Sequence, residues 1–210
     1  MRELLGKYRG FICAAVLGVA VAACIPTSDS PILVDGQDPA DPALIGTWYG
    51  ALDEDDGPFF IHFFRPESEQ DDVPAGGMSA VLVYGGEEAD DEGGWASMYA
   101  LTAEVAGQTY LSMKFQLNNG EETVGAERGW HLFAYEIDND TFRLRAVDED
   151  RLADLLNAGA LQRTATGGNF TSETRITAGS AELVNFLQTP EADDLFTVEQ
   201  GSFTRVIPGR

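Results

Sequence analysis

Cys24 has the most distinctive chemical setting in this sequence. It follows Val21, Ala22 and Ala23, three short side chains at the end of an apolar run that begins at Phe11. The first ten residues hold three basic side chains and one acidic one. A basic segment, a short apolar run and a small-residue site are the parts of a secretory signal peptide. The run is shorter than the roughly 20 apolar residues of a membrane-spanning helix, so the pattern predicts export.

The sequence Val21-Ala22-Ala23-Cys24 resembles, position by position, the lipobox of bacterial lipoproteins. In that family the Cys sulfur receives a diacylglyceryl group, the preceding peptide is removed and the new amine is acylated. The resemblance implies that residues 1–23 are a lipoprotein signal peptide and that acyl chains such as palmitate on Cys24 attach the protein to a membrane. Ile25 stands where an aspartate commonly marks inner-membrane retention. The resemblance therefore implies the outer membrane, with the protein facing the periplasm or the cell surface. An ordinary signal peptide cut nearby is the alternative.

The two histidines are the other side chains that titrate near neutral pH. His62 and His131 each lie in a predicted strand. Cys13 lies in the predicted signal peptide and Cys24 is expected to be acylated, so the folded part of the chain has no free thiol. Zinc usually takes three or four protein ligands, so carboxylates would have to complete a site. The sequence also lacks a nucleophile elbow, a phosphate loop and a dinucleotide-binding fingerprint. We therefore expect no metal, no cofactor and no catalytic residue, although these patterns do not exclude an enzyme.

The chain is strongly acidic, with 35 acidic and 13 basic residues and a formal net charge of −22. A surface of this sign repels phosphate backbones and anionic lipid headgroups, and no cluster of Lys or Arg offsets it. We therefore expect no nucleic-acid partner and a membrane attachment through acyl chains. The acidity serves either solubility or cation binding, and the sequence leaves both open.

Residues 24–42 precede any periodic pattern of apolar side chains. Such a Pro-rich and polar composition is typical of a flexible linker. We predict a tether there and a single β-rich domain over residues 43–210, which is long enough to bury a core without disulfides. The prolines of the segment are Pro26, Pro31, Pro39 and Pro42.

From residue 43, short β-rich runs alternate with acidic or Gly-rich turns, which is the pattern of an antiparallel barrel or sandwich. Alternation is clearest at residues 109–117 and 130–137, and residues 138–140 fit a hairpin turn. Residues 59–64 are apolar at nearly every position, so we expect both faces of that strand to be covered. The predicted strands are 44–52, 59–65, 79–84, 96–106, 109–117, 130–137, 141–147, 171–177 and 202–206.

Two short helices are predicted late in the chain. Residues 148–158 have three leucines on one face, acidic side chains at the start and Gly159 at the position of a left-handed C-terminal cap. Ser180 is expected to cap a second helix, whose apolar stripe ends before Pro190. The whole pattern predicts a mainly β domain of about eight or nine strands with both helices packed on the sheet.

Gly46-Thr47-Trp48, at the start of the first strand, resembles the Gly-x-Trp signature of lipocalins and related calycin barrels. Arg205, in the last strand, resembles the arginine that packs across the Trp ring in that superfamily. A closed barrel brings its first and last strands together, and a guanidinium over an indole gains cation–π attraction. The resemblance implies a calycin-like barrel closed by Trp48 and Arg205, with a β-sandwich as the alternative. The two predicted helices depart from the lipocalin order, which has one helix before the last strand.

These observations predict a lipid-anchored protein of the cell envelope. In a calycin-like barrel a small apolar ligand would lie in an interior cavity. The alternative is a structural or assembly lipoprotein with a solid core that binds another envelope protein. Barrels of about eight strands can be filled by their own side chains, so both hypotheses stay open at this level. The residues expected to line a cavity are Phe63, Val83, Met98, Phe115 and Phe133.

Overall fold

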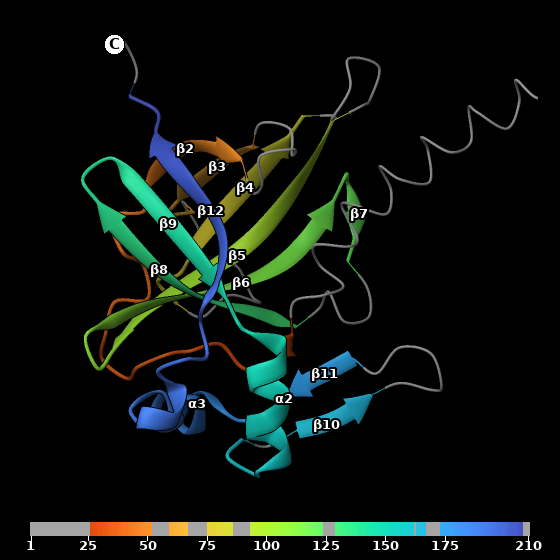
Figure 1. Ribbon diagram of the computed structural model, residues 1–210. Coiled ribbons are helices and arrows are strands. Elements are labelled where there is room, and N and C mark those ends of the chain that lie inside the picture. The colour runs from red at the N-terminus through yellow and green to blue at the C-terminus, as the bar shows by residue number, and fades with distance from the viewer. Residues whose placement is uncertain are drawn as a thin grey trace, which may run out of the picture.

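Eight strands of the described chain form a closed antiparallel barrel in the computed structural model, which describes residues 26–51, 59–66, 75–85, 93–123, 129–161, 163–166 and 173–207 (Figure 1). Strands β2 to β6 form a meander in which each strand pairs with the next. β6 pairs with β8, β8 with β9, β9 with β12, and β12 with β2, which closes the ring. The barrel strands are β2 (Gly46–Ala51), β3 (Phe59–Phe64), β4 (Met78–Tyr84), β5 (Gly94–Val105), β6 (Gln108–Asn118), β8 (Trp130–Asp138), β9 (Thr141–Ala146) and β12 (Val198–Arg205).

Local sequence explains the tight turns of this barrel. The β5–β6 turn contains Ala106 and Gly107, with φ of 52° and 82°, and two positive φ angles suit the right-handed twist of the flanking strands. Asn139, with φ of 54°, lies in the turn between β8 and β9. Asn tolerates this left-handed conformation better than most residues. The predicted hairpin is therefore confirmed, as is the mainly β fold, and the closed ring decides for a barrel over a sandwich.

Helix α2 (Glu149–Asn157) begins and ends as its sequence predicts. The Asp148 side chain caps it by accepting a hydrogen bond of 2.9 Å from the Arg151 backbone N–H. At the other end Gly159 has φ of 76°, and the N–H of Ala160 donates to the Leu155 carbonyl at 2.9 Å. A left-handed glycine followed by this bond is a standard helix stop.

Helix α3 (Ser180–Leu187) corrects one detail of the prediction. Its N-cap is Gly179, which makes no side-chain capping hydrogen bond, and Ser180 is already the first helical residue. The expected cap by Ser180 is wrong because the extended backbone of Gly179 starts the helix one residue earlier. A short 3₁₀ helix, η2 (Pro190–Ala192), follows.

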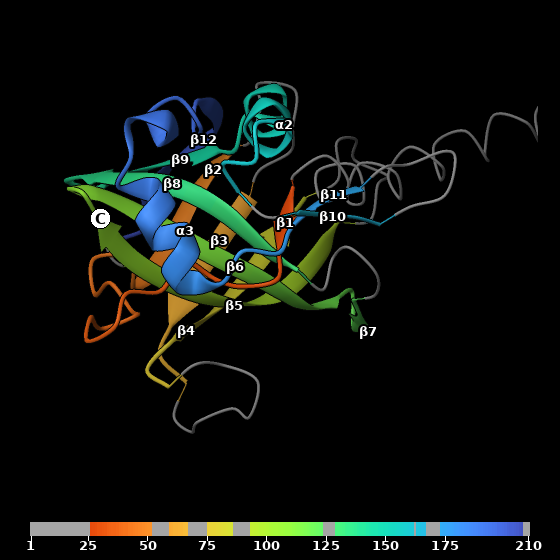
Figure 2. The same cartoon turned by 90° about the horizontal axis from the view of Figure 1, so that it is seen from below.

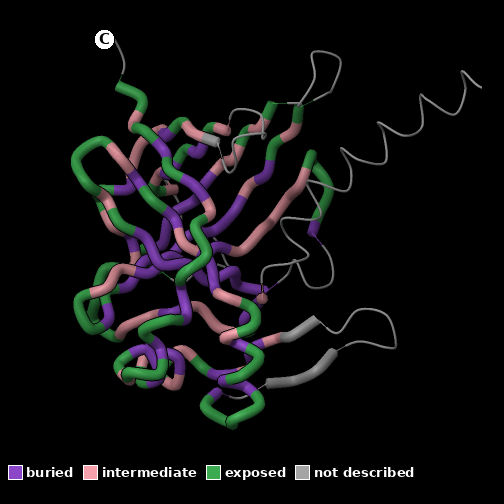
Figure 3. The backbone as a smooth tube through the Cα atoms, in the orientation of Figure 1, coloured by how far each residue is buried: buried purple, intermediate pink, exposed green. Residues whose placement is uncertain are grey.

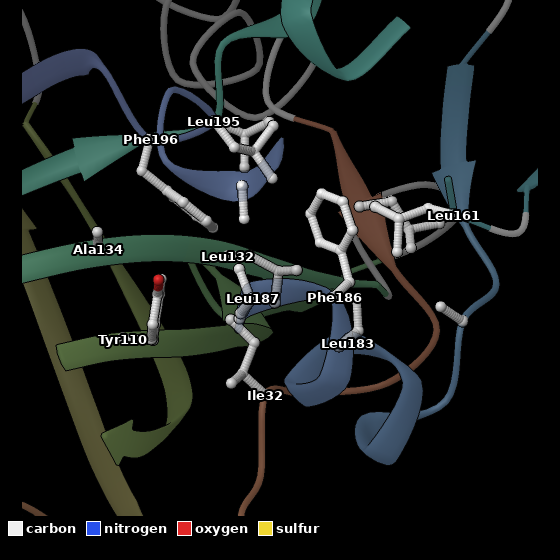
Figure 4. Packing of buried hydrophobic residues seen from close by; sticks show 14 of the residues in the cluster. Ile32, Tyr110, Leu132, Ala134, Leu161, Leu183, Phe186, Leu187, Leu195 and Phe196 are labelled. Atoms are coloured by element: carbon white, nitrogen blue, oxygen red, sulfur yellow. The ribbon is translucent and has the colours of Figure 1, made fainter. Parts of the chain in front are cut away.

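The helices cover the outer wall of one part of the barrel (Figure 2). Outward-facing side chains of β5, β6 and β8 meet the apolar faces of α2 and α3 and the segment before β12, and they form a second core outside the ring. Tyr110 packs edge-on against Phe196, with ring centroids 5.2 Å apart. Figure 4 shows part of this outer core around Ile32, Leu132, Leu183, Phe186 and Leu187.

The segment from Pro26 to Pro42 is packed on the barrel, which corrects the predicted tether. Strand β1 (Thr27–Ser28) pairs antiparallel with β8 and parallel with β11 (Glu173–Ile176), which in turn pairs with β10 (Arg163–Thr166). Ile32 is 1% exposed in the outer core, and its N–H donates to Ser112 Oγ at 3.0 Å. The Pro-rich composition misled the prediction because single residues such as Ile32 and Ala40 are buried in a segment that has no apolar periodicity. The proposed signal peptide and Cys24 lie outside the described residues.

Strand β3 is covered on one face only, so the expectation of two covered faces is wrong. Ile61 and Phe63 point into the barrel and are 4% and 0% exposed, whereas Phe60 is 42% exposed on the outer wall beside the exposed His62. The outer core lies over β5, β6 and β8, so it does not reach this strand. Figure 3 marks along the backbone which residues are buried, intermediate or exposed.

Candidate functional site

Trp48 and Arg205 lie together at one end of the barrel, called here the closed end. They face each other in the register of β2 and β12, and the Arg205 guanidinium carbon is 4.1 Å from the centroid of the Trp48 ring. Arg205 also donates to the backbone oxygens of Ile45, at 2.9 Å, and Ala43. Trp48 is fully buried and donates from Nε1 to the Leu44 carbonyl at 2.8 Å. The structure therefore brings these two residues into the contact that the calycin resemblance implies.

Residues 38–45, called here the plug, cover the closed end of the barrel. Ala40 and Leu44 are 1% and 0% exposed and belong to the interior core. The backbone N–H of Asp41 donates to Thr102 Oγ1 at 2.9 Å. Apolar contacts and backbone hydrogen bonds thus hold the plug to the wall.

Asp41 and Tyr135 add a polar contact that the sequence did not indicate. The Tyr135 hydroxyl donates to Asp41 Oδ2 at 2.8 Å. Burial, and then this hydrogen bond to a carboxylate, raises the pKa of Tyr135 above its usual range. Nothing in the Pro-rich sequence around Asp41 predicts this pairing, because Tyr135 is 94 residues away.

Aromatic rings fill the closed half of the interior. The Phe142 ring centroid lies 5.5 Å from that of Trp48, 6.2 Å from Phe63, 5.9 Å from Tyr135 and 5.5 Å from Phe203. Rings at such separations are in direct packing contact. These side chains therefore occupy the space that a hollow barrel would leave for a ligand.

The structure brings four of the five expected cavity residues into the barrel interior. Phe63, Met98 and Phe133 are 0%, 1% and 5% exposed within the interior core. Phe115 is partly buried against the same core. Their packing is that of core residues.

Val83 is the exception, and its assignment to the interior is wrong. It is 46% exposed on the outer wall, because Met78, Ala80 and Leu82 are the residues of β4 that pack on the interior core. Successive side chains of a strand point to opposite faces, so a shift of one position reverses the direction. The run of five apolar residues from Ala80 to Tyr84 carries no alternation that would have shown this.

The opposite end of the barrel, called here the mouth, is less tightly packed. Phe59, Leu82 and Phe115 point toward the interior core there and stay only partly buried. His131 is 1% exposed, meets the Phe115 ring edge-on with centroids 5.3 Å apart, and has no hydrogen-bond partner at Nε2. Burial lowers the pKa of His131 to about 4, so the imidazole is neutral at pH 7.

The buried His131 predicts an acid-sensitive fold. Unfolded, this side chain takes up a proton near pH 6.5, whereas in the folded state it does so only near pH 4. As the pH falls from 6.5 to 4, protonation therefore stabilises the unfolded state relative to the folded state. Relative to a His131→Leu variant, the wild type should lose up to about 1.4 kcal/mol of unfolding free energy per pH unit. Urea unfolding at a series of pH values measures it, with His62→Leu as the control for loss of a strand histidine. Parallel pH profiles for the wild type and His131→Leu would refute the prediction.

His62 lies on the outer wall and does not approach His131. Its Nδ1 lies 2.9 Å from Thr47 Oγ1, and its ring stacks on that of Phe64 with centroids 5.6 Å apart. Within the described ranges, no three His, Cys, Asp or Glu side chains gather in a way that could hold a metal ion. The described helices are all too short or too polar to cross a membrane.

The fold and its closed end define a class of protein, a closed eight-stranded antiparallel barrel compatible with a calycin-like fold. No protein-family model, no curated protein and no solved structure matches this chain.

Proposed function

We propose that this protein is a lipid-anchored component of the bacterial cell envelope whose solid barrel binds another envelope protein. The observation that carries the proposal is the filled interior, in which four aromatic rings pack around Phe142. A barrel filled by its own side chains has no room for a ligand inside, so a partner would bind its outer surface. The proposed role is therefore binding or assembly, and the proposal names no reaction.

The proposed anchor is Cys24, in the lipobox-like sequence Val21-Ala22-Ala23-Cys24. Strand β1 begins at Thr27, only three residues further on. Three extended residues span at most about 11 Å, so the barrel would lie directly on the membrane surface. Ile25 after the cysteine favours the outer membrane.

A small apolar ligand bound at the mouth is the second candidate function. It is favoured by the partly buried, inward-facing Phe59, Leu82 and Phe115, and by the unpartnered Nε2 of His131. Native mass spectrometry with lipid extraction separates the two candidates. An apolar molecule bound in one copy per chain would favour the ligand, and an empty barrel would favour the solid one.

Replacing Cys24 tests the anchor. In a bacterial host that processes lipoproteins, Cys24→Ala should move the protein from the membrane fraction to the soluble fraction and abolish incorporation of labelled palmitate. The physical reason is that two or more acyl chains anchor a protein stably, whereas their complete loss removes the attachment. Cys13→Ala, which lies within the proposed signal peptide, should keep both properties of the wild type. A Cys24→Ala protein that stays in the membrane fraction, with an unlabelled wild type, would disprove acylation.

A further inference from the structure

A row of four exposed apolar side chains crosses the outer wall of the barrel near the mouth. Tyr49 pairs with Phe60, Phe60 with Val83, and Val83 with Trp95, so the four residues are consecutive partners across β2, β3, β4 and β5. They are 47%, 42%, 46% and 39% exposed, respectively. We call these four residues the apolar row.

The apolar row is continuous and sharply bounded. Neighbouring strands lie about 4.8 Å apart, so the row extends about 14 Å across the wall. The rings of Tyr49 and Phe60 are in contact, with centroids 5.0 Å apart. Thr204 is the partner of Tyr49 on the β12 side, and Asn119 hydrogen-bonds to the Trp95 backbone on the β6 side. A contiguous apolar strip with polar ends is typical of an interaction surface.

The outer core, which covers the outer wall over β5, β6 and β8, does not include this row. Tyr99, Leu101, Ala103 and Val105 of β5 belong to the outer core under the helices. Trp95, on the same strand but closer to the mouth, lies outside that core. No segment in the described part of the chain buries the row, so its side chains are available to an occupant from another molecule.

The charge around the apolar row defines the chemistry of that occupant. Strands β2 to β5 contain no Lys or Arg, and they lead in sequence into residues 52–58 and 86–92, which hold nine acidic residues and no basic one. On the β6 side, a methyl group on Gly120 would lie 3.9 Å from the Trp95 ring, so the turn into the exposed strand β7 (Glu121–Glu122) lies beside the row. An occupant should combine apolar side chains with positive charge.

This charge argues against two other occupants. A second copy of the chain would bring two equally acidic surroundings face to face, and like charges across an interface disfavour association. An anionic lipid surface is repelled for the same reason. We propose that the apolar row is the docking site for a protein segment whose apolar side chains are flanked by Lys or Arg. This rests on the proposed function and names the surface and partner chemistry for it.

Peptide binding to row variants tests the proposal. The protein is the full chain with Cys24→Ala, which removes the proposed acyl attachment, and the probe is an extended peptide of alternating leucine and lysine. A Phe60→Thr/Val83→Thr variant leaves the net charge unchanged and keeps residues that suit strands. It should weaken binding of this peptide at least about tenfold, because apolar contacts at the centre of an interface dominate affinity. Val198→Thr, which alters another exposed valine outside the row, should bind as the wild type does.

A lysine and serine peptide of the same charge isolates the electrostatic part. This peptide should bind the acidic protein more weakly than the leucine and lysine peptide does, and with the same affinity for the wild type and the row variant. Far-ultraviolet circular dichroism establishes that each variant is folded before binding is compared. Equal affinity of the wild type and the row variant for the leucine and lysine peptide would overturn the proposal.

Two further measurements cover the competing occupants. Row-dependent binding to phosphatidylcholine vesicles with no row-dependent peptide binding would replace the protein partner with a lipid surface. Row-dependent dimerisation in sedimentation would replace it with a second copy of the chain. Cys24 can be acylated even if the apolar row does not bind the peptide, and the row can bind the peptide even if Cys24 is not acylated. The two proposals can therefore fail independently of each other.

Discussion

Replacing Trp48 with alanine should lower the free energy of unfolding by about 3–5 kcal/mol, which is a large part of the roughly 5–15 kcal/mol that stabilises a domain. The variant would lose the packing of a fully buried indole against Phe142 and the hydrogen bond from Nε1 to the Leu44 carbonyl. It would also leave the Arg205 guanidinium without the ring beneath it. Chemical denaturation measures the change, and Trp95→Ala, at a 39% exposed tryptophan on the outer wall, is the control and should cost much less.

A double-mutant cycle then isolates the contact between Trp48 and Arg205. Arg205→Ala alone should cost about 1–2 kcal/mol, from the loss of cation–π attraction and of packing by its stem. The double variant should cost less than the two single variants together, because residues in contact do not act independently. Arg205→Lys should recover only part of the loss, since an ammonium group lacks the fork that reaches the Ile45 and Ala43 carbonyls. Strict additivity in the cycle would mean that the contact contributes nothing to closing the barrel.

Phe142→Ala should have an effect of the same size, about 3–5 kcal/mol. Phe142 is 0% exposed and its ring contacts those of Trp48, Phe63, Tyr135 and Phe203, so truncation would leave a cavity in the centre of the closed half. The cost arises because the four surrounding rings relax only partly into the vacated space.

The control for Phe142 is Phe60→Ala, which removes the same number of atoms from a 42% exposed position on the outer wall. It should destabilise the protein far less. If both variants lose the same small amount, the interior is loosely packed, and the hypothesis of a hollow, ligand-holding barrel would gain over that of a solid one. A small loss in Phe142→Ala together with binding of an apolar fluorescent probe would point the same way.

Local patterns in the sequence were sufficient to predict most barrel strands to within a few residues. The positions of β6 and β8, the Asn139 turn and the two ends of α2 depend on residues close to one another in the chain, so short-range chemistry determines them. The pairing of Trp48 with Arg205 was also predicted, from the resemblance to calycin barrels, and it is consistent with the rule that a closed barrel joins its first and last strands.

The sequence misled where a residue's environment comes from distant parts of the chain. Ile32 lies in a segment that reads as a linker, and its burial depends on a hydrogen bond to Ser112, 80 residues away, and on side chains of α3. Asp41 likewise acquires its role in the plug through Tyr135. Composition cannot reveal such contacts because the partners are brought together only by the fold.

The sequence alone determined that the chain forms a mainly β domain and carries a strong negative charge. The tertiary structure decided which wall of the barrel is covered and which is left bare. Val83 and Phe60 belong to runs that are apolar at every position or nearly so, and such runs do not show which side chains face inward. The phase of each strand is set by pairing with its neighbours, and burial of the outer face is set by helices that come from elsewhere in the chain. Because those helices lie over β5, β6 and β8, an apolar row remains exposed on β2 to β5.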